Sequence, residues 1–68
     1  MELSRLVYMA NQIARNLAPQ GEDQAAAAAV AEHIRLFWDP RMKAQILAHA
    51  KSSADGLDPL TRTALEKL

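Results

Sequence analysis

Two histidines, two adjacent serines and several scattered carboxylates are the side chains of this sequence that could act in catalysis or metal binding. His33 and His49 are the only histidines, and no H-x-x-x-H, H-E-x-x-H or E-x-x-H motif joins them on one helix. Ser52 and Ser53 have no histidine or acid at a spacing typical of nucleophilic catalysis. The glycines are isolated, and neither precedes a lysine as in a phosphate-binding loop. We therefore expect no catalytic, cofactor-binding or metal-binding residue here. For both histidines we expect a half-buried, hydrogen-bonded position, with a partner contact as the alternative.

Aromatic and arginine side chains could instead contact another protein, because such residues are enriched where interfaces are strongest. The stretch FWDPRM, residues 37–42, holds the only phenylalanine and the only tryptophan of the chain. Trp38, expected at the outside of a sharp corner, and Arg41 are the leading candidates for partner contact. For Trp38, stapling two helices of its own chain and docking on a partner are equally weighted. The further candidates are Tyr8, on the polar side of its helix, His33 and Leu36, and an ordinary surface position is the alternative for Tyr8.

Glycine and proline divide the chain into the elements that must position these side chains. They cluster at residues 18–21, 39–40 and 54–59 and leave segments without strand-like alternation. The pattern predicts an all-α fold, a small bundle of three to four helices in a single domain over residues 1–68. The expected helices cover about residues 3–18, 23–38, 40–52 and 59–67.

The first two predicted helices differ in how much of their circumference is apolar. In the first, Leu3 to Leu17 carry apolar residues at three- and four-residue spacing, which describes one core face before Pro19 and Gly21 end the helix. The second is expected to open at Glu22 and Asp23, whose charges suit a helix N-terminus. Its alanine run allows close helix approach, and its apolar arc is about twice as wide as one core face needs. We therefore expect two packing partners for this helix, one of which could be another chain.

Two Asp-Pro steps predict the starts of the last two helices. Aspartate at the N-cap accepts a hydrogen bond from the first turn, and proline at the next position has its backbone already suited to a helix. Asp39-Pro40 predicts the start of the third helix, and Asp58-Pro59 predicts the start of the fourth in the same way. The third helix has the weakest apolar pattern of the four.

Composition narrows the classes of protein to which the chain can belong. Its 68 residues carry eight basic and eight acidic side chains, so a basic surface that binds nucleic acid is not expected. The sequence has no cysteine, so a thiolate metal site is not expected either. No apolar run approaches the roughly 20 residues of a membrane span, which favours a cytoplasmic location without membrane contact. Such a short chain buries only about 60% of its unfolded surface, so a partner that completes the core is expected.

Three segments together resemble a known family. The run HIRLFWDPRMKAQILAH at 33–49, with MANQIA at 9–14 and GLDPLTRTALEKL at 56–68, is similar to the delta subunit of NAD-dependent, molybdenum-containing formate dehydrogenases. The resemblance implies a small non-catalytic accessory subunit of a soluble complex that oxidises formate. It further implies that the molybdenum cofactor, iron–sulfur clusters, FMN and NAD are bound by larger partner subunits, with the molybdenum-containing catalytic subunit as the expected contact.

Three interpretations of the chain stay open at this point. In the first it is a resident subunit that stabilises the enzyme complex. In the second it is a transient assembly factor for molybdenum cofactor insertion. The third is a free-standing homodimeric interaction module, in which the wide apolar face packs against its own copy.

Overall fold

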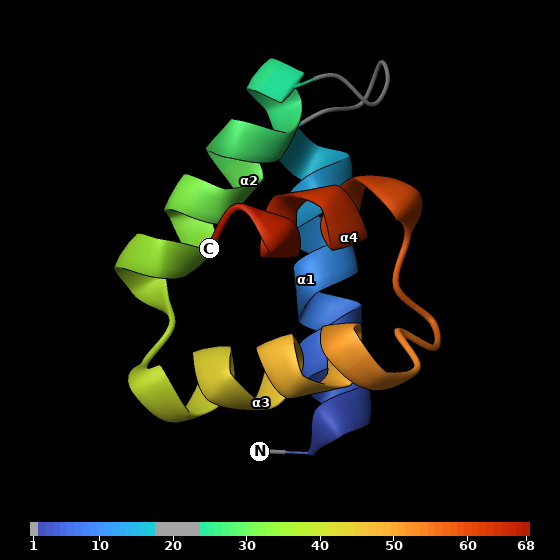
Figure 1. Ribbon diagram of the computed structural model, residues 1–68. Helices are drawn as coiled ribbons and strands as arrows, with labels where there is room; N and C mark the ends of the chain where they lie inside the picture. Colours follow the sequence, from blue (N-terminus) through green and yellow to red (C-terminus); the bar gives the residue numbers. More distant parts are fainter. Residues whose placement is uncertain (1, 18–23) are drawn as a thin grey trace.

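The structure is a computed structural model that describes residues 2–17 and 24–68. In these ranges the chain forms four α-helices and no strand (Figure 1). The helices are α1 (Leu3–Leu17), α2 (Gln24–Phe37), α3 (Pro40–Ser52) and α4 (Pro59–Glu66). The predicted all-α bundle is confirmed. The expected helix end at Pro19 and Gly21 and the expected start at Glu22 and Asp23 lie outside the described residues.

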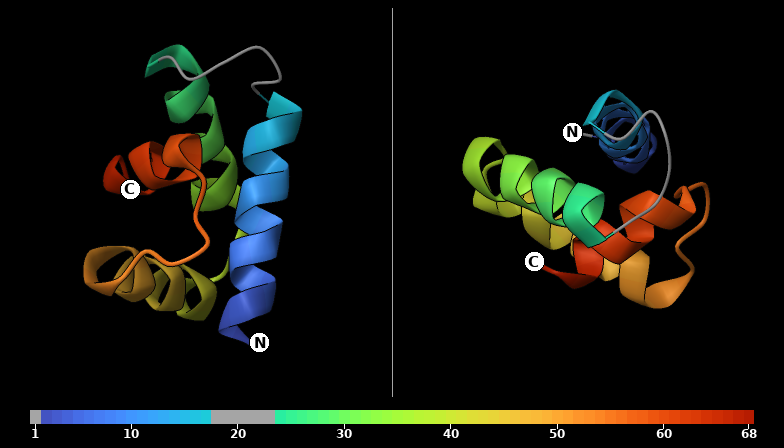
Figure 2. Two further views of the ribbon diagram at one scale, coloured as in Figure 1. Left: turned by 90° about the vertical axis from the view of Figure 1, so that its right-hand side faces the viewer. Right: turned by 90° about the horizontal axis from the view of Figure 1, so that it is seen from above.

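The four helices are stacked at two levels along α1. In both side views α3 lies across the end of α1 that carries the N-terminus, while α4 lies further along α1 and beside α2 (Figures 1 and 2). Helix α1 contacts all three other helices, and α4 also contacts α2 and α3. The corner between α2 and α3 therefore lies at one end of the molecule, with residues 37–39 at its tip.

One apolar cluster joins all four helices. The fully buried side chains include Leu6 of α1, Ile34 of α2, Ile46 of α3 and Ala64 of α4. Helices α1 and α2 contact each other, and each carries a fully buried alanine, Ala10 in α1 and Ala27 in α2. The predicted weakness of α3 is visible in the core, because only Ile46 of that helix is buried.

The wide apolar arc of α2 is largely covered from within the chain. Helix α2 packs against α1 and against α4, so both predicted packing partners belong to the same molecule. Ala27, Val30, Ala31 and Ile34 are its buried residues. The part of the arc that α1 and α4 leave uncovered is smaller than the sequence alone indicated, and it lies mainly at the C-terminal end of the helix.

A polar clasp ties α1 to the segment that leads into α4. The side-chain amide of Asn11 donates to the Gly56 carbonyl at 2.8 Å, and its oxygen accepts from the Asp58 backbone N–H at 3.0 Å and the Thr61 hydroxyl at 2.8 Å. The predicted side-chain cap by Asp58 is wrong: its carboxylate makes no cap hydrogen bond and instead accepts from Arg15 at 3.2 Å. The Asp58 carboxylate thus binds the Arg15 guanidinium and not the first turn of α4. The predicted helix start at Pro59 is confirmed.

None of the helices in the described ranges is long and apolar enough to span a membrane.

Candidate partner-binding surface

The corner between α2 and α3 is built by the Asp-Pro step. Asp39 has an extended backbone, with φ −77° and ψ 167°, and its carboxylate accepts a hydrogen bond from the Met42 N–H at 2.8 Å. On the other side of the corner, the Lys43 ammonium donates to the Arg35 carbonyl of α2 at 3.3 Å. That carbonyl lies in the last turn of α2, where backbone oxygens lack partners within the helix. The predicted cap is confirmed, and the corner is held by polar contacts from both helices.

The two aromatic residues at this corner have opposite environments. Trp38 is only 5% exposed and belongs to the core cluster, whereas Phe37 is 72% exposed. The expectation that Trp38 lies at the outside of the corner is wrong. Helix α2 ends at Phe37, and the Trp38 side chain turns inward while its backbone N–H still donates to the Ile34 carbonyl at 3.0 Å. Of its two predicted roles, stapling within its own chain is the one that this position fits.

The outward-facing part of the corner is an apolar surface on the last turns of α2. Leu36 is 60% exposed, and the half-buried imidazole of His33 lies against the exposed ring of Phe37, with centroids 4.8 Å apart and planes tilted by 41°. Residues three and four apart share one side of a helix, so these side chains are neighbours. We call His33, Leu36 and Phe37 the α2 face. Exposed Ala25 and Ala29 continue it toward the start of the helix.

The remaining candidate residues lie on other helices. Arg41 is exposed on the first turn of α3, four residues after Phe37 in the sequence. Tyr8 is 62% exposed on α1, as predicted from its place on the polar side of that helix. At about 100° per residue it lies opposite the buried Leu6, Ala10 and Ala14 of that helix. The structure thus brings His33 and Leu36 together on one surface and leaves Tyr8 on a separate one.

The polar groups that could do chemistry are engaged in local structure. His49 is half-buried, and its Nε2 lies 2.8 Å from the Asp55 carbonyl in the segment that follows α3. This is the predicted hydrogen-bonded position for His49, and the half-buried position predicted for His33 is also confirmed. Glu32 forms an ion pair with Arg35 of the same helix. Within residues 2–17 and 24–68, no three His, Cys, Asp or Glu side chains gather closely enough to hold a metal ion.

Phe37 is the surface residue that sequence reasoning missed. On a helical wheel it falls beside Val30 and Ile34, so periodicity assigned it to the core stripe. Its position as the last residue of α2 was the available signal, because a helix end can project beyond the helices that cover the rest of the stripe. The α2 face offers an exposed aromatic ring, an exposed leucine and an imidazole tilted against that ring. Such a surface is suited to binding a complementary apolar surface.

Comparison with known proteins gives one family. The model of the family described as "NADH-dependant formate dehydrogenase delta subunit FdsD" matches residues 5–65 of the 68-residue chain. This match confirms the resemblance seen in the segments at 9–14, 33–49 and 56–68. The comparisons with curated proteins and with solved structures gave no match.

Proposed function

The chain belongs to the FdsD family, the delta subunits of NADH-dependent formate dehydrogenases, and on this premise we propose that it is a non-catalytic accessory subunit. A delta subunit belongs to a complex with other subunits. We propose that this chain binds a larger subunit through the α2 face, and that binding stabilises the enzyme or helps to assemble it. The molybdenum-containing catalytic subunit is the proposed contact.

The exposure of Leu36 and Phe37 is the observation that carries this proposal. The only phenylalanine of the chain is 72% exposed and its neighbouring leucine is 60% exposed, while the core is built from smaller side chains and one tryptophan. Covering a large apolar side chain stabilises a complex by about 1.5–3 kcal/mol. Aromatic residues are also enriched at the cores of protein interfaces. An interface over the α2 face would therefore gain binding energy from two adjacent positions.

The redox groups of the enzyme are proposed to lie in the partner subunits. Iron–sulfur clusters are held mainly by cysteine thiolates, and this sequence contains no cysteine. The residues of this chain therefore do not fit an iron–sulfur cluster. We propose that the molybdenum cofactor, the clusters, FMN and NAD are all bound by the larger subunits, and that this chain contributes no group to formate oxidation.

A pull-down from native cytoplasm with tagged chain, followed by size exclusion and mass identification, tests the proposal. We expect an active formate dehydrogenase to be recovered with the tagged chain. Recovery only with catalytic subunit that lacks its cofactor would instead make the chain an assembly factor. Recovery of self-associated chain alone, with formate oxidation in another fraction, would contradict the proposal and favour the homodimer.

Matched variants connect the result to the α2 face. Leu36→Ser should reduce recovery of the partner, because it removes an exposed apolar side chain from the proposed interface. Leu17→Ser makes the same change at the end of α1, at a leucine that is 44% exposed. It should leave recovery unchanged. Equal recovery with both variants would show that the α2 face is not the contact.

A further inference from the structure

A second surface with binding character lies on another side of the molecule, between α3 and α4. Its apolar side chains are Leu47 and Ala50 of α3, Leu65 of α4 and Leu68 beyond it, and the pocket they line has a volume of about 450 Å³. Leu65 is buried at its floor, and Leu68 is 37% exposed at its rim. We call it the α3–α4 groove. It shares Leu68 with a shallower depression that reaches Ala28 and Ala31 of α2.

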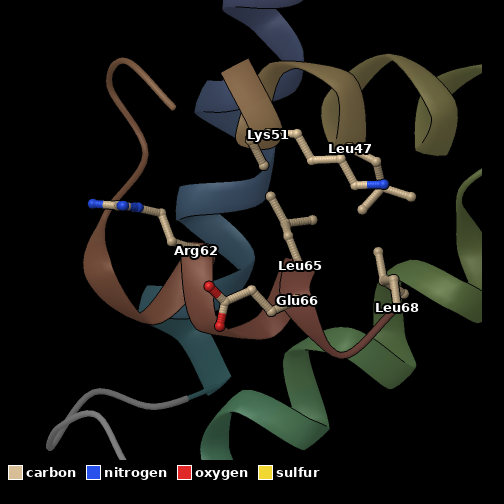
Figure 3. A pocket seen from close by; sticks show the side chains of 7 residues that line it. Leu47, Lys51, Arg62, Leu65, Glu66 and Leu68 are labelled. Carbon is tan, nitrogen blue, oxygen red and sulfur yellow. The ribbon is translucent and has the colours of Figure 1, made fainter. Parts of the chain in front are cut away.

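Charged side chains border the apolar part of this groove. Figure 3 shows Leu47, Leu65 and Leu68 directed toward the same space, with Lys51 extending from α3 toward Leu47 and Arg62 extending outward from α4. Both cations are exposed, and neither has an ion-pair partner among the described residues. Among the described side chains, Glu66 is the only anionic one that lines the groove itself.

The charge of this region differs from that of the rest of the chain. The groove and the adjoining depression are lined by four cationic side chains and two anionic ones, a net charge of +2. The cations are Arg35, Lys51, Arg62 and Lys67, and the anions are Glu32 and Glu66. The whole sequence has a formal net charge of zero, so its other side chains together carry a net charge of −2. Within the pair Arg35 and Glu32 the charges cancel, which leaves three cations against Glu66.

This combination of apolar floor and positive rim limits what can occupy the groove. A membrane surface is a poor match, because recruitment to anionic lipid takes clusters of about four to eight basic residues, whereas the groove itself is lined by two, Lys51 and Arg62. A nucleic acid needs a longer basic stripe to contact successive phosphates. A protein segment with leucine-like side chains on one side and carboxylates beside them matches both the apolar floor and the charge. Helical segments bind in grooves of this kind through residues spaced by three and four positions.

We propose that the α3–α4 groove is a second docking site, and that it takes an acidic amphipathic helical segment of a partner protein. Leu47, Leu65 and Leu68 would contact the apolar side of that segment, while Lys51 and Arg62 would pair with its carboxylates. The proposal concerns a different surface from the α2 face. The groove is lined by residues of α3 and α4 and by Leu68, and it shares no residue with the α2 face.

Titration of the full chain with designed peptides tests this site. The probe is a short, end-capped helical peptide with leucines on one side and glutamates on the other, and the charge control carries lysines in place of the glutamates. Amide chemical shifts of the isotopically labelled chain report where each peptide binds. We expect the acidic peptide to shift the amides of Leu47, Leu65 and Leu68, to bind more weakly as salt is raised, and to bind better than its lysine control.

Charge-reversal variants then locate the attraction on the chain. Arg62→Glu should weaken binding of the acidic peptide by at least about threefold, because attraction is replaced by repulsion. The double variant with Lys51→Glu should weaken that binding by at least about tenfold. Arg5→Glu makes the same change at an exposed residue of α1 and should have no effect on the affinity. All of these positions are exposed, and circular dichroism verifies that each variant keeps its helices.

Four results would overturn the proposal. They are equal binding of the acidic and basic peptides, dissociation constants weaker than about 1 mM for both, shifts confined to the α2 face, and unchanged affinity in the Lys51 and Arg62 double variant. Co-sedimentation of the chain with phosphatidylserine vesicles, in place of peptide binding, would assign the groove to a membrane. None of these results changes the expected effect of Leu36→Ser on recovery of the enzyme, so failure here is distinct from failure of the proposed function.

Discussion

Removal of the Asn11 side chain tests whether the polar clasp holds α1 to the segment before α4. Asn11 is 8% exposed, and its three hydrogen bonds join positions 45, 47 and 50 residues away in the sequence. Asn11→Ala removes all three bonds and leaves the hydroxyl of Thr61, a fully buried residue, without this partner. We expect the variant to lose a contact between the two ends of the chain that no neighbouring side chain replaces.

The expected loss in free energy of unfolding follows from the number of hydrogen bonds that Asn11→Ala removes. Each intramolecular hydrogen bond contributes about 0.5–1.5 kcal/mol net, so three bonds amount to about 3 kcal/mol. Alanine is a better helix former than asparagine by about half a kcal/mol, which leaves a net loss of about 2–3 kcal/mol. A native chain is stable by roughly 0.05–0.15 kcal/mol per residue, or about 3–10 kcal/mol for a domain of this size. The variant therefore loses a large fraction of its free energy of unfolding.

Urea denaturation measures this loss, with circular dichroism reporting the helices and the fluorescence of buried Trp38 reporting the core. Asn16→Ala is the matched control, because it makes the same change at an exposed position of α1. Thr61→Val removes one of the bonding groups, and a double-mutant cycle with Asn11→Ala should give a coupling of about 1 kcal/mol. A loss below about 0.5 kcal/mol for Asn11→Ala, or strict additivity in the cycle, would refute the clasp as a source of stability.

Three further changes test the corner and the turn by thermal or urea unfolding. Trp38→Ala should cost about 3–5 kcal/mol because it empties a buried site, and a change below about 1 kcal/mol would contradict its place in the core. Asp39→Ala should cost about 1 kcal/mol through loss of the bond to the Met42 N–H, and more than Asp58→Ala, whose side chain makes no cap bond; the reverse order would show that the caps are wrongly assigned. Gly56→Ala should cost about 1–2 kcal/mol because Gly56 has φ +80°, and an unchanged midpoint would show that the turn relaxes.

The helices could be predicted from sequence because their signals are local. The Asp39 cap and the proline that follows it fix the start of α3 through neighbouring residues, and the structure has α3 over Pro40–Ser52 as expected. The hydrogen bonds of Asn11 have no such local signal, because its partners lie 45 to 50 residues away in the sequence. Which carbonyl, N–H and hydroxyl it binds depends on how α1 and α4 pack, and periodicity carries no signal for that.

The corner shows where the helical wheel fails. The outer position expected for Trp38 came from its place at the corner, whereas its side chain is buried in the core. Phe37 lies on the apolar side of the wheel but at the end of the helix, and it is exposed as a result. The sequence pattern placed the exposed aromatic residue at Trp38, whereas the exposed large apolar side chains at the end of α2 are Leu36 and Phe37. The two-sided packing of α2 was predicted, while the identity of both partners, α1 and α4, required the structure.

The affinity of this chain for formate dehydrogenase purified without it tests whether the α2 face joins the chain to the enzyme, with Phe37→Ser compared against the wild type. We expect the wild type to bind the enzyme. Phe37→Ser, which removes an apolar contact of about 1.5–3 kcal/mol, should weaken binding by roughly ten- to hundredfold. The melting temperature of the isolated variant should stay close to that of the wild type, because the side chain is 72% exposed. Undiminished binding by Phe37→Ser, or no binding by the wild type, would contradict the assignment of the α2 face as the surface that joins this chain to the enzyme.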